Sequence, residues 1–216
     1  MANITATVPR PAISPDDAEP TRWLDQPVPT PKFGDHGYCT IASSVRIAAP
    51  PQTCLGIVLH APGYASPHAW NNWVRKITIT SSPAGDDASS SAAAGIPAEL
   101  TGPDYLSNGA QFDMSIFMDH TTTSSPRVQS MDVTACEALT DGRKGFRVGW
   151  TYCMFGLHCE RIQEFVDDGE GGTVYTTWET FGGVIARIVW LTNASGIQRG
   201  FIEWGRGLKE KAETMG

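Results

Sequence analysis

The sequence lacks any apolar run that approaches the ~20 residues of a transmembrane helix. Its first residues, MANITATVPRPAISPDD, also lack the charged start and apolar stretch of a secretory signal. It has no C-x-x-C pair and an odd number of cysteines, five, which indicates free thiols in a reducing compartment. We therefore expect a cytoplasmic protein that does not insert into membranes.

Charged residues are scarce, at 18% of the chain, and the net charge is −7. A nucleic acid or an anionic membrane surface would require a basic face, so we expect neither as a partner. Hydrophobic residues make up 41% of the 216 residues, which is enough for a substantial core in one domain.

The signature motifs of several enzyme classes are absent, including G-x-S-x-G, G-x-x-x-x-G-K-[ST], G-x-G-x-x-G and H-E-x-x-H. His60 and His68 are separated by a Pro-Gly break. His158 and Cys159 are adjacent in an expected strand and so point to opposite faces. We therefore expect no metal site.

Two segments differ in composition from the rest. Residues 1–35 contain seven prolines, so we predict an extended N-terminal arm, 1–36, before a folded domain, 37–216. Trp23 and Leu24 are its expected anchors. Such an arm is ordered by packing on its own domain or on a partner, and a homodimer formed through the arm is one expectation. The low-complexity segment 82–103 is predicted to be an exposed loop.

Six further stretches have the pattern of strands joined by turn-rich connections, after a first strand at 39–49 and short helical pieces at 49–70. They cover residues 72–81, 109–119, 126–139, 142–155, 158–168 and 172–181. Alternation is clear in two of them. One inward face is predicted to carry Phe112, Met114, Ile116 and Met118, and the other Phe146, Val148, Trp150, Tyr152 and Met154.

The last segment changes to a helical period. Its apolar stripe contains Ile197, Phe201, Trp204, Leu208 and Ala212. Ser195 with Gln198 three residues later predicts a capping box at the start of this helix. Three glycines within the helix, Gly200, Gly205 and Gly207, each cost about 1 kcal/mol relative to alanine, which predicts a close approach to a sheet or a ligand.

The order of these elements resembles the SRPBCC superfamily, with its START-like or pollen-allergen-type helix-grip fold, and within it the fungal polyketide cyclase/dehydrase-like branch. The stretches that carry the resemblance span roughly residues 38–213: VRIAAPPQTCLGIV, HAWNNWVRKITIT, YLSNGAQFDMSIFM, FRVGW, ERIQEF, TVYTTWETFGG and the final F-x-x-W-x-x-x-L-K helix. The loop at 82–103 is longer than the family pattern, and the proline-rich arm lies outside it.

The resemblance implies an α+β fold in which a curved antiparallel sheet of about six or seven strands wraps a long C-terminal helix. Two short helices would lie between the first two strands, and an apolar cavity would lie between sheet and helix. The side chains expected to line it are Trp70, Phe112, Met114, Ile116, Trp150, Tyr152, Tyr175, Phe201 and Trp204. Trp70 would close the short-helix end and Trp73 would begin a strand, with the two asparagines between them satisfying the turn backbone; the alternative is that both rings only seal the core.

Three polar residues are candidates for chemistry in such a cavity. Glu179 would face inward if Tyr175 and Thr177 do, and an apolar surrounding would poise its carboxylate as an acid or base; the alternative is a salt bridge to Arg161 or Arg187. Tyr152 could bind a phenolic or carbonyl ligand, or be a core tyrosine. Arg161 could hold a carboxylate or enolate, or pair with a strand neighbour.

Three alternative functions remain, of which the resemblance implies the first two. The first is a cofactor-independent cyclase, dehydratase or isomerase acting on a hydrophobic, polyketide-like intermediate. The second is a carrier that binds a lipid, sterol or pigment without chemistry. The third is an interaction role for the arm and the 82–103 loop. An acid–base pair that meets inside the cavity would favour the enzyme over the carrier.

Overall fold

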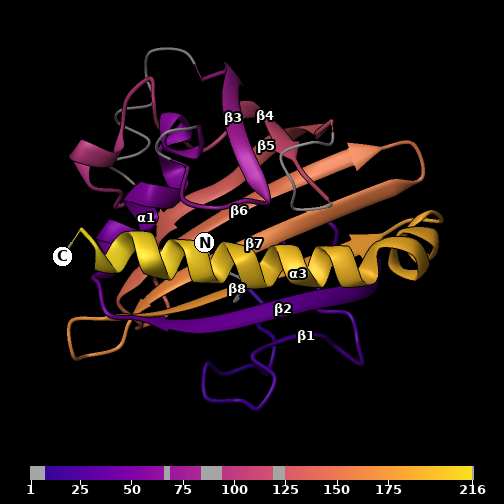
Figure 1. Ribbon diagram of the computed structural model, residues 1–216, viewed down its shortest axis with the longest axis horizontal. Coiled ribbons are helices and arrows are strands. Elements are labelled where there is room, and N and C mark those ends of the chain that lie inside the picture. The colour runs from indigo at the N-terminus through magenta and orange to yellow at the C-terminus, as the bar shows by residue number, and fades with distance from the viewer. Residues whose placement is uncertain (1–7, 66–68, 84–93, 119–124, 216) are drawn as a thin grey trace, which may run out of the picture.

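The computed structural model describes residues 8–65, 69–83, 94–118 and 125–215. One antiparallel sheet of eight strands carries a long helix, α3 (Ala186–Glu213), along one face (Figure 1). This is the α+β helix-grip arrangement that the resemblance to the SRPBCC superfamily implies. Within the described ranges, no helix combines the length and the apolar character needed to cross a membrane.

The strands of the sheet lie in the order β1-β2-β8-β7-β6-β5-β4-β3. Their bounds are β1 Thr21–Trp23, β2 Gly37–Ile47, β3 Val74–Ser81, β4 Gln111–Ile116, β5 Arg127–Ala138, β6 Gly145–Met154, β7 Leu157–Asp167 and β8 Thr173–Gly182. Strand β1 is additional to the expected six or seven. It lies in the proline-rich arm and pairs with β2 through Thr21 opposite Ser43 and Trp23 opposite Ile41, so the arm contributes to the sheet.

The arm around Val28 packs on the face of the sheet opposite α3, whereas Trp23 lies on the helix side, where its Nε1 donates to the Ala194 carbonyl at 3.3 Å. On the face opposite α3, Val28 is buried with Ala42, Ile162 and Trp178, and Leu24 packs against this cluster. The Trp23 ring lies 5.9 Å from that of Phe181. The predicted anchors are therefore both in contact with the chain's own domain.

An ion-pair cluster also joins the arm to this outer face. The Glu164 carboxylate on β7 is fully buried and accepts contacts from three guanidinium groups, those of Arg10 at 2.6 Å, Arg143 at 2.7 Å and Arg147 at 2.9 Å. Arg10 belongs to the arm, so a buried charge of the sheet is neutralised partly by the arm.

Two short helical pieces separate β2 from β3, as predicted: α1 (Pro51–Leu59) and the 3-10 turn η1 (Ala61–Tyr64). A second 3-10 turn, η2 (Ala98–Leu100), lies in the segment predicted to be an exposed loop. Residues 84–93 of that segment lie outside the described residues, but Ile96 and Leu100 are buried. The prediction of exposure was therefore wrong for these two side chains, because both are apolar residues that reach the core.

Helix α3 begins nine residues before the predicted capping box, so that prediction was wrong. Ser195 is an exposed residue inside the helix, and Gln198 Nε2 donates instead to the Thr21 carbonyl at 3.1 Å. The early turns gave no amphipathic signal because Ile185 and Val189 face the interior while Ile188 and Leu191 are exposed. Apolar residues all round a helix hide the 3.6-residue period.

The W-N-N-W turn sets the position of α3 against the sheet. A Cβ added at Gly200 would overlap the ring of Trp73, and one added at Gly207 would overlap the carbonyl oxygen of Trp70. The predicted close approach is thus made to these two tryptophans. Asn71 Oδ1 accepts the backbone N–H groups of Trp73 at 2.9 Å and of Val74 at 2.6 Å, as expected for the turn.

Candidate functional site

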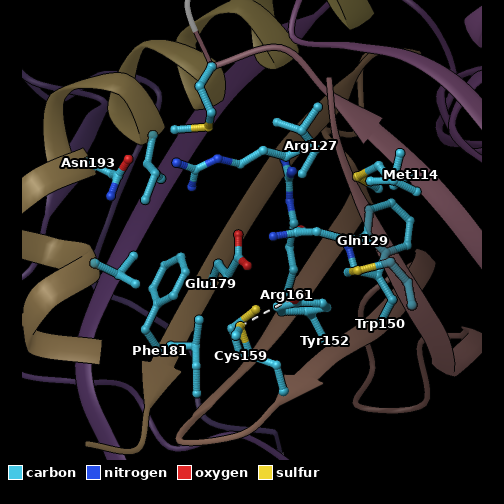
Figure 2. Close-up of a pocket in the computed structure, with 18 of the residues that line it drawn as sticks. Met114, Arg127, Gln129, Trp150, Tyr152, Cys159, Arg161, Glu179, Phe181 and Asn193 are labelled. Carbon is cyan, nitrogen blue, oxygen red and sulfur yellow. Dashed lines mark hydrogen bonds between the residues drawn. The ribbon is translucent and has the colours of Figure 1, made fainter. Parts of the chain in front are cut away.

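A pocket of about 420 Å³ lies between the sheet and the first half of α3 (Figure 2). Its volume is within the range of small-molecule sites. Strands β4 to β8 contribute one side and the helix the other. The lining residues include Met114, Ile116, Gln129, Met131, Trp150, Tyr152, Cys159, Arg161, Glu179, Phe181, Val189, Asn193 and Ile197.

Four of the nine expected cavity residues line this pocket: Met114, Ile116, Trp150 and Tyr152. The other five, Trp70, Phe112, Tyr175, Phe201 and Trp204, are buried elsewhere in the interior. The cavity is shorter than expected because aromatic rings fill the end near α1. Trp204 lies at its centre, 4.9 Å from Trp70, 5.9 Å from Tyr64 and 6.0 Å from Trp150 between ring centroids.

Glu179 and Arg161 are brought together by strand register. They lie directly opposite each other on β8 and β7, and both line the pocket. Figure 2 shows the Glu179 carboxylate directed into the cavity. Among the described residues, no cation lies within 4.0 Å of this carboxylate, so the alternative of a salt bridge to Arg161 or Arg187 is not what the structure shows.

The surroundings of Glu179 favour its protonated form. Burial raises the pKa of its carboxyl group above the usual range, and the charge of Arg161 and the thiol of Cys159 offset only part of this effect. A carboxyl group with a raised pKa in a pocket is a group that can give a proton to a ligand or take one from it.

Arg161 is buried, with 2% of its surface exposed. Its Nε donates to Thr177 Oγ1 at 3.1 Å, and its Cζ lies 4.3 Å from the Trp204 ring centroid and 4.4 Å from that of Phe201. Its Nη2 has no hydrogen-bond partner in the described part of the chain. The alternative that Arg161 pairs with a strand neighbour is therefore what the structure shows, and the partner is the hydroxyl group of Thr177 on β8 and not a carboxylate.

Tyr152 lies opposite Cys159 in the β6–β7 pair, one cross-strand row away from Arg161 and Glu179. It is partly buried, and its hydroxyl donates to Met154 Sδ at 3.4 Å, a weak bond that leaves the oxygen lone pairs free. Burial raises the pKa of the Cys159 thiol, so this side chain is a neutral neighbour of Glu179.

Sequence reasoning missed Arg127, Gln129, Asn193 and Cys159 as lining residues. The first two lie at the start of β5, where Arg127, Gln129 and Met131 share a face. That alternation was a usable signal. Asn193 gave none, because the helix was predicted to begin after it.

Histidine and cysteine side chains gather at no centre within the described ranges, where no group of three or more His, Cys, Asp or Glu residues could hold a metal ion. His60 stacks on Tyr105 with ring centroids 5.2 Å apart, and His158 on Phe33 at 4.3 Å. His68 lies outside the described residues. The polar side chains that line the pocket are those of Arg127, Gln129, Tyr152, Arg161, Glu179 and Asn193.

No protein-family model matches the sequence, and no curated protein matches it. Solved structures do share the fold. Hypothetical protein jhp0584 from Helicobacter pylori is 14% identical at a TM-score of 0.56, with 79% of this chain and 86% of that one covered. A START superfamily protein from Mycobacterium smegmatis is 13% identical at a TM-score of 0.52, with 82% of this chain and 99% of that one covered.

A third neighbour, the Zhui aromatase/cyclase from Streptomyces sp. R1128, is 10% identical at a TM-score of 0.50, with 81% of this chain and 93% of that one covered. At such identities the likeness concerns the fold. The shared features are those described above, a sheet that carries one long C-terminal helix with a pocket between them. The chain has the helix-grip fold and shares it with this START superfamily protein and this aromatase/cyclase.

Proposed function

We propose that the pocket performs cofactor-independent acid–base chemistry on a hydrophobic, polyketide-like small molecule, as a cyclase, dehydratase or isomerase. The observation that carries this proposal is the cross-strand pair of Glu179 and Arg161 inside an otherwise largely apolar pocket. A carrier needs one or two polar groups to orient its ligand, whereas proton transfer needs an acid or base beside a group that holds the reacting oxygen.

In this proposal, Glu179 gives a proton to the substrate or takes one from it. Arg161 binds the carbonyl or enolate oxygen whose charge changes during the reaction, and the Tyr152 hydroxyl supplies a further hydrogen bond. Met114, Ile116 and other apolar lining residues confine a flexible chain, which lowers the entropic cost of cyclisation.

The proposal includes a place in the fungal polyketide cyclase/dehydrase-like branch and a cytoplasmic location. One structural neighbour is named an aromatase/cyclase, which supports the reaction class at the level of fold. All five cysteines are free thiols, which supports a reducing compartment.

The second candidate is a carrier for a lipid, sterol or pigment, and the apolar character of most lining residues favours it. The homodimer through the arm stays a prediction. The apolar side chains of the arm, such as Val28 and Leu24, are engaged with the chain's own sheet.

Native mass spectrometry of the protein from its producing cells separates the two candidates. For an enzyme, we expect an empty pocket, or a bound precursor that turns over in the wild type and persists in Glu179→Gln or Tyr152→Phe. A ligand that stays chemically unchanged on incubation, and that both variants retain, would establish the carrier and overturn the enzyme.

A further inference from the structure

The pocket contains a buried cation that forms no salt bridge with the described residues. Arg161 is surrounded by the rings of Trp204 and Phe201, and no carboxylate of the described residues lies within 4.0 Å of its guanidinium. Charges removed from water are normally paired, because an uncompensated buried charge is strongly destabilising. By contrast, the buried Glu164 on the other face of the same strand is neutralised by three arginines. A bound anion would therefore supply the negative charge that the guanidinium group of Arg161 lacks within 4.0 Å.

Four strands contribute the charged and titratable groups around Glu179. They are Cys39 on β2, Arg161 and Cys159 on β7, Tyr152 on β6 and Arg127 on β5, while α3 contributes the neutral Asn193. The pocket lining therefore has two guanidinium groups and one carboxylate. An incoming anion would complete the balance at Arg161.

We infer that the pocket binds a small organic anion, a carboxylate or an enolate, with Arg161 as its counter-ion and with uptake of one proton by Glu179. This inference rests on the proposed function, because it names the substrate class of the same site. The proton comes from solvent and ends on a Glu179 carboxylate oxygen. No covalent bond of the ligand changes in this step.

Proton uptake follows from the geometry of the site. Glu179 and Arg161 occupy opposite positions on neighbouring strands, so an anion at Arg161 would also lie close to the Glu179 carboxylate. Two negative charges at such a distance in a partly desolvated pocket disfavour each other's ionised form. The outcome is a protonated carboxyl group beside a bound anion, which is the arrangement needed to deliver a proton to it.

Isothermal titration calorimetry on the full chain tests the inference with two probes of equal shape. The anion 2-naphthoate and the neutral 2-naphthamide are titrated between about pH 5.5 and 8, where a carboxylate with a pKa near 4 stays ionised. Titration in two buffers of different ionisation enthalpy measures the protons taken up. We expect the wild type to bind 2-naphthoate at least about tenfold more tightly than 2-naphthamide, a difference in binding free energy of about 1.4 kcal/mol.

We also expect proton uptake that approaches one per 2-naphthoate as the pH rises through the pKa of Glu179 in the free protein. Above that pH, the affinity for 2-naphthoate should fall by up to about tenfold per pH unit. The amide should show neither effect, because it introduces no charge.

Three variants assign the two roles. Glu179→Gln should bind 2-naphthoate without proton uptake and with a flat pH profile. Arg161→Gln should lose the preference for the anion, whereas Arg161→Lys, which keeps the charge, should retain most of it. Arg187→Gln is the control, because Arg187 is an exposed cation at the start of α3 outside the pocket lining, and it should keep both the preference and the proton uptake.

Several results would overturn the inference: equal affinity of the wild type for the two probes, no binding of 2-naphthoate at millimolar concentration, or proton uptake that persists in Glu179→Gln. These results are distinguishable from a failure of the proposed function. A carrier would show the anion preference without any turnover. An enzyme for neutral substrates would lose turnover in Glu179→Gln while binding both probes equally.

Discussion

The indole ring of Trp73 lies against Gly200 of α3 so closely that a Cβ atom on the glycine would overlap it. Trp73 is the last residue of the W-N-N-W turn and directly precedes β3. It lines the pocket, and its ring centroid lies 5.8 Å from that of Phe201. The absence of a side chain at Gly200 therefore fixes how near the helix lies to the sheet, and with it the width of the pocket.

Replacement of this glycine should destabilise the protein although alanine is the better helix former. We expect Gly200→Ala to lower the free energy of unfolding by about 1–3 kcal/mol, because the methyl group overpacks the contact with Trp73. Gly205→Ala is the matched control. Its Cβ would meet Val45 at an ordinary 3.7 Å, so the same substitution should be neutral or stabilising by up to about 1 kcal/mol. Urea unfolding of both variants measures the difference, and equal effects would contradict the contact.

Two carboxylates, the partly buried Glu179 and the buried Glu164, should give the free energy of unfolding opposite dependences on pH. For Glu179, burial raises the pKa in the folded state, so its favourable contribution is present below the unfolded pKa and is lost as the pH rises through the folded pKa. Glu179→Gln mimics the neutral acid. It should therefore be more stable than the wild type at pH 8, and this advantage should disappear toward about pH 4, near the unfolded value.

Glu164 should behave in the opposite way. Burial alone would raise its pKa, but hydrogen bonds from Arg143 and Arg147 and the charge of Arg10 outweigh burial and lower it. Its contribution is then present above the unfolded pKa and is lost as the pH falls through the folded one. Glu164→Gln should cost about 3 kcal/mol at neutral pH and progressively less in acid. Urea midpoints at a series of pH values test both variants, and parallel curves would be inconsistent with the assigned shifts.

Thiol reactivity should be confined to one cysteine. Burial raises the pKa of Cys39 and Cys136 to about 12 and that of Cys54 to about 11, while Cys153 is exposed. The thiolate is the reactive form, so iodoacetamide at neutral pH should label Cys153 alone in the folded protein. Peptide mass mapping measures this, and Cys153→Ser should abolish fast labelling. Rapid modification of Cys54 would show that its site opens.

Removal of the arm should destabilise the whole domain. Without residues 1–36, Trp178 and Ile162 lose the cover of Val28 and Leu24, and Glu164 loses Arg10. Burial of a tryptophan is worth roughly 4–6 kcal/mol, so we expect a loss of that order and binding of a hydrophobic dye. The full chain and the shortened chain are compared by urea unfolding and by sizing. An unchanged midpoint would mean that the arm is dispensable, and a full chain of twice the mass would support the homodimer.

The strand pattern was readable from the sequence because alternation survives wherever one face of a strand is apolar and the other polar. Phe112, Met114 and Ile116 show this on β4. It fails on β8, where Trp178 is buried under the arm while Tyr175 is buried on the helix side. A strand covered on both faces carries no period, so the packing of the arm was not predictable beyond its anchors.

The face that carries Glu179 was predictable, because Tyr175, Thr177 and Glu179 are two residues apart on β8 and so point to the same side. That Glu179 lies opposite Arg161 was not predictable, because it depends on the register of two strands. The length of the cavity was not predictable. Whether Phe201 and Trp204 line a space or fill it depends on how far their rings extend toward Trp70 and Trp150, which is a property of packing and not of pattern.

The strand order has a consequence for synthesis on the ribosome. The first long strand, β2, pairs with β8, which is the last strand of the chain. Helix α3, which forms the other side of the pocket, follows β8. Most of the chain must leave the exit tunnel before these early residues can find their partners. Until then, the tryptophans of the W-N-N-W turn have no helix to pack on, so the nascent chain exposes both rings until α3 has been made.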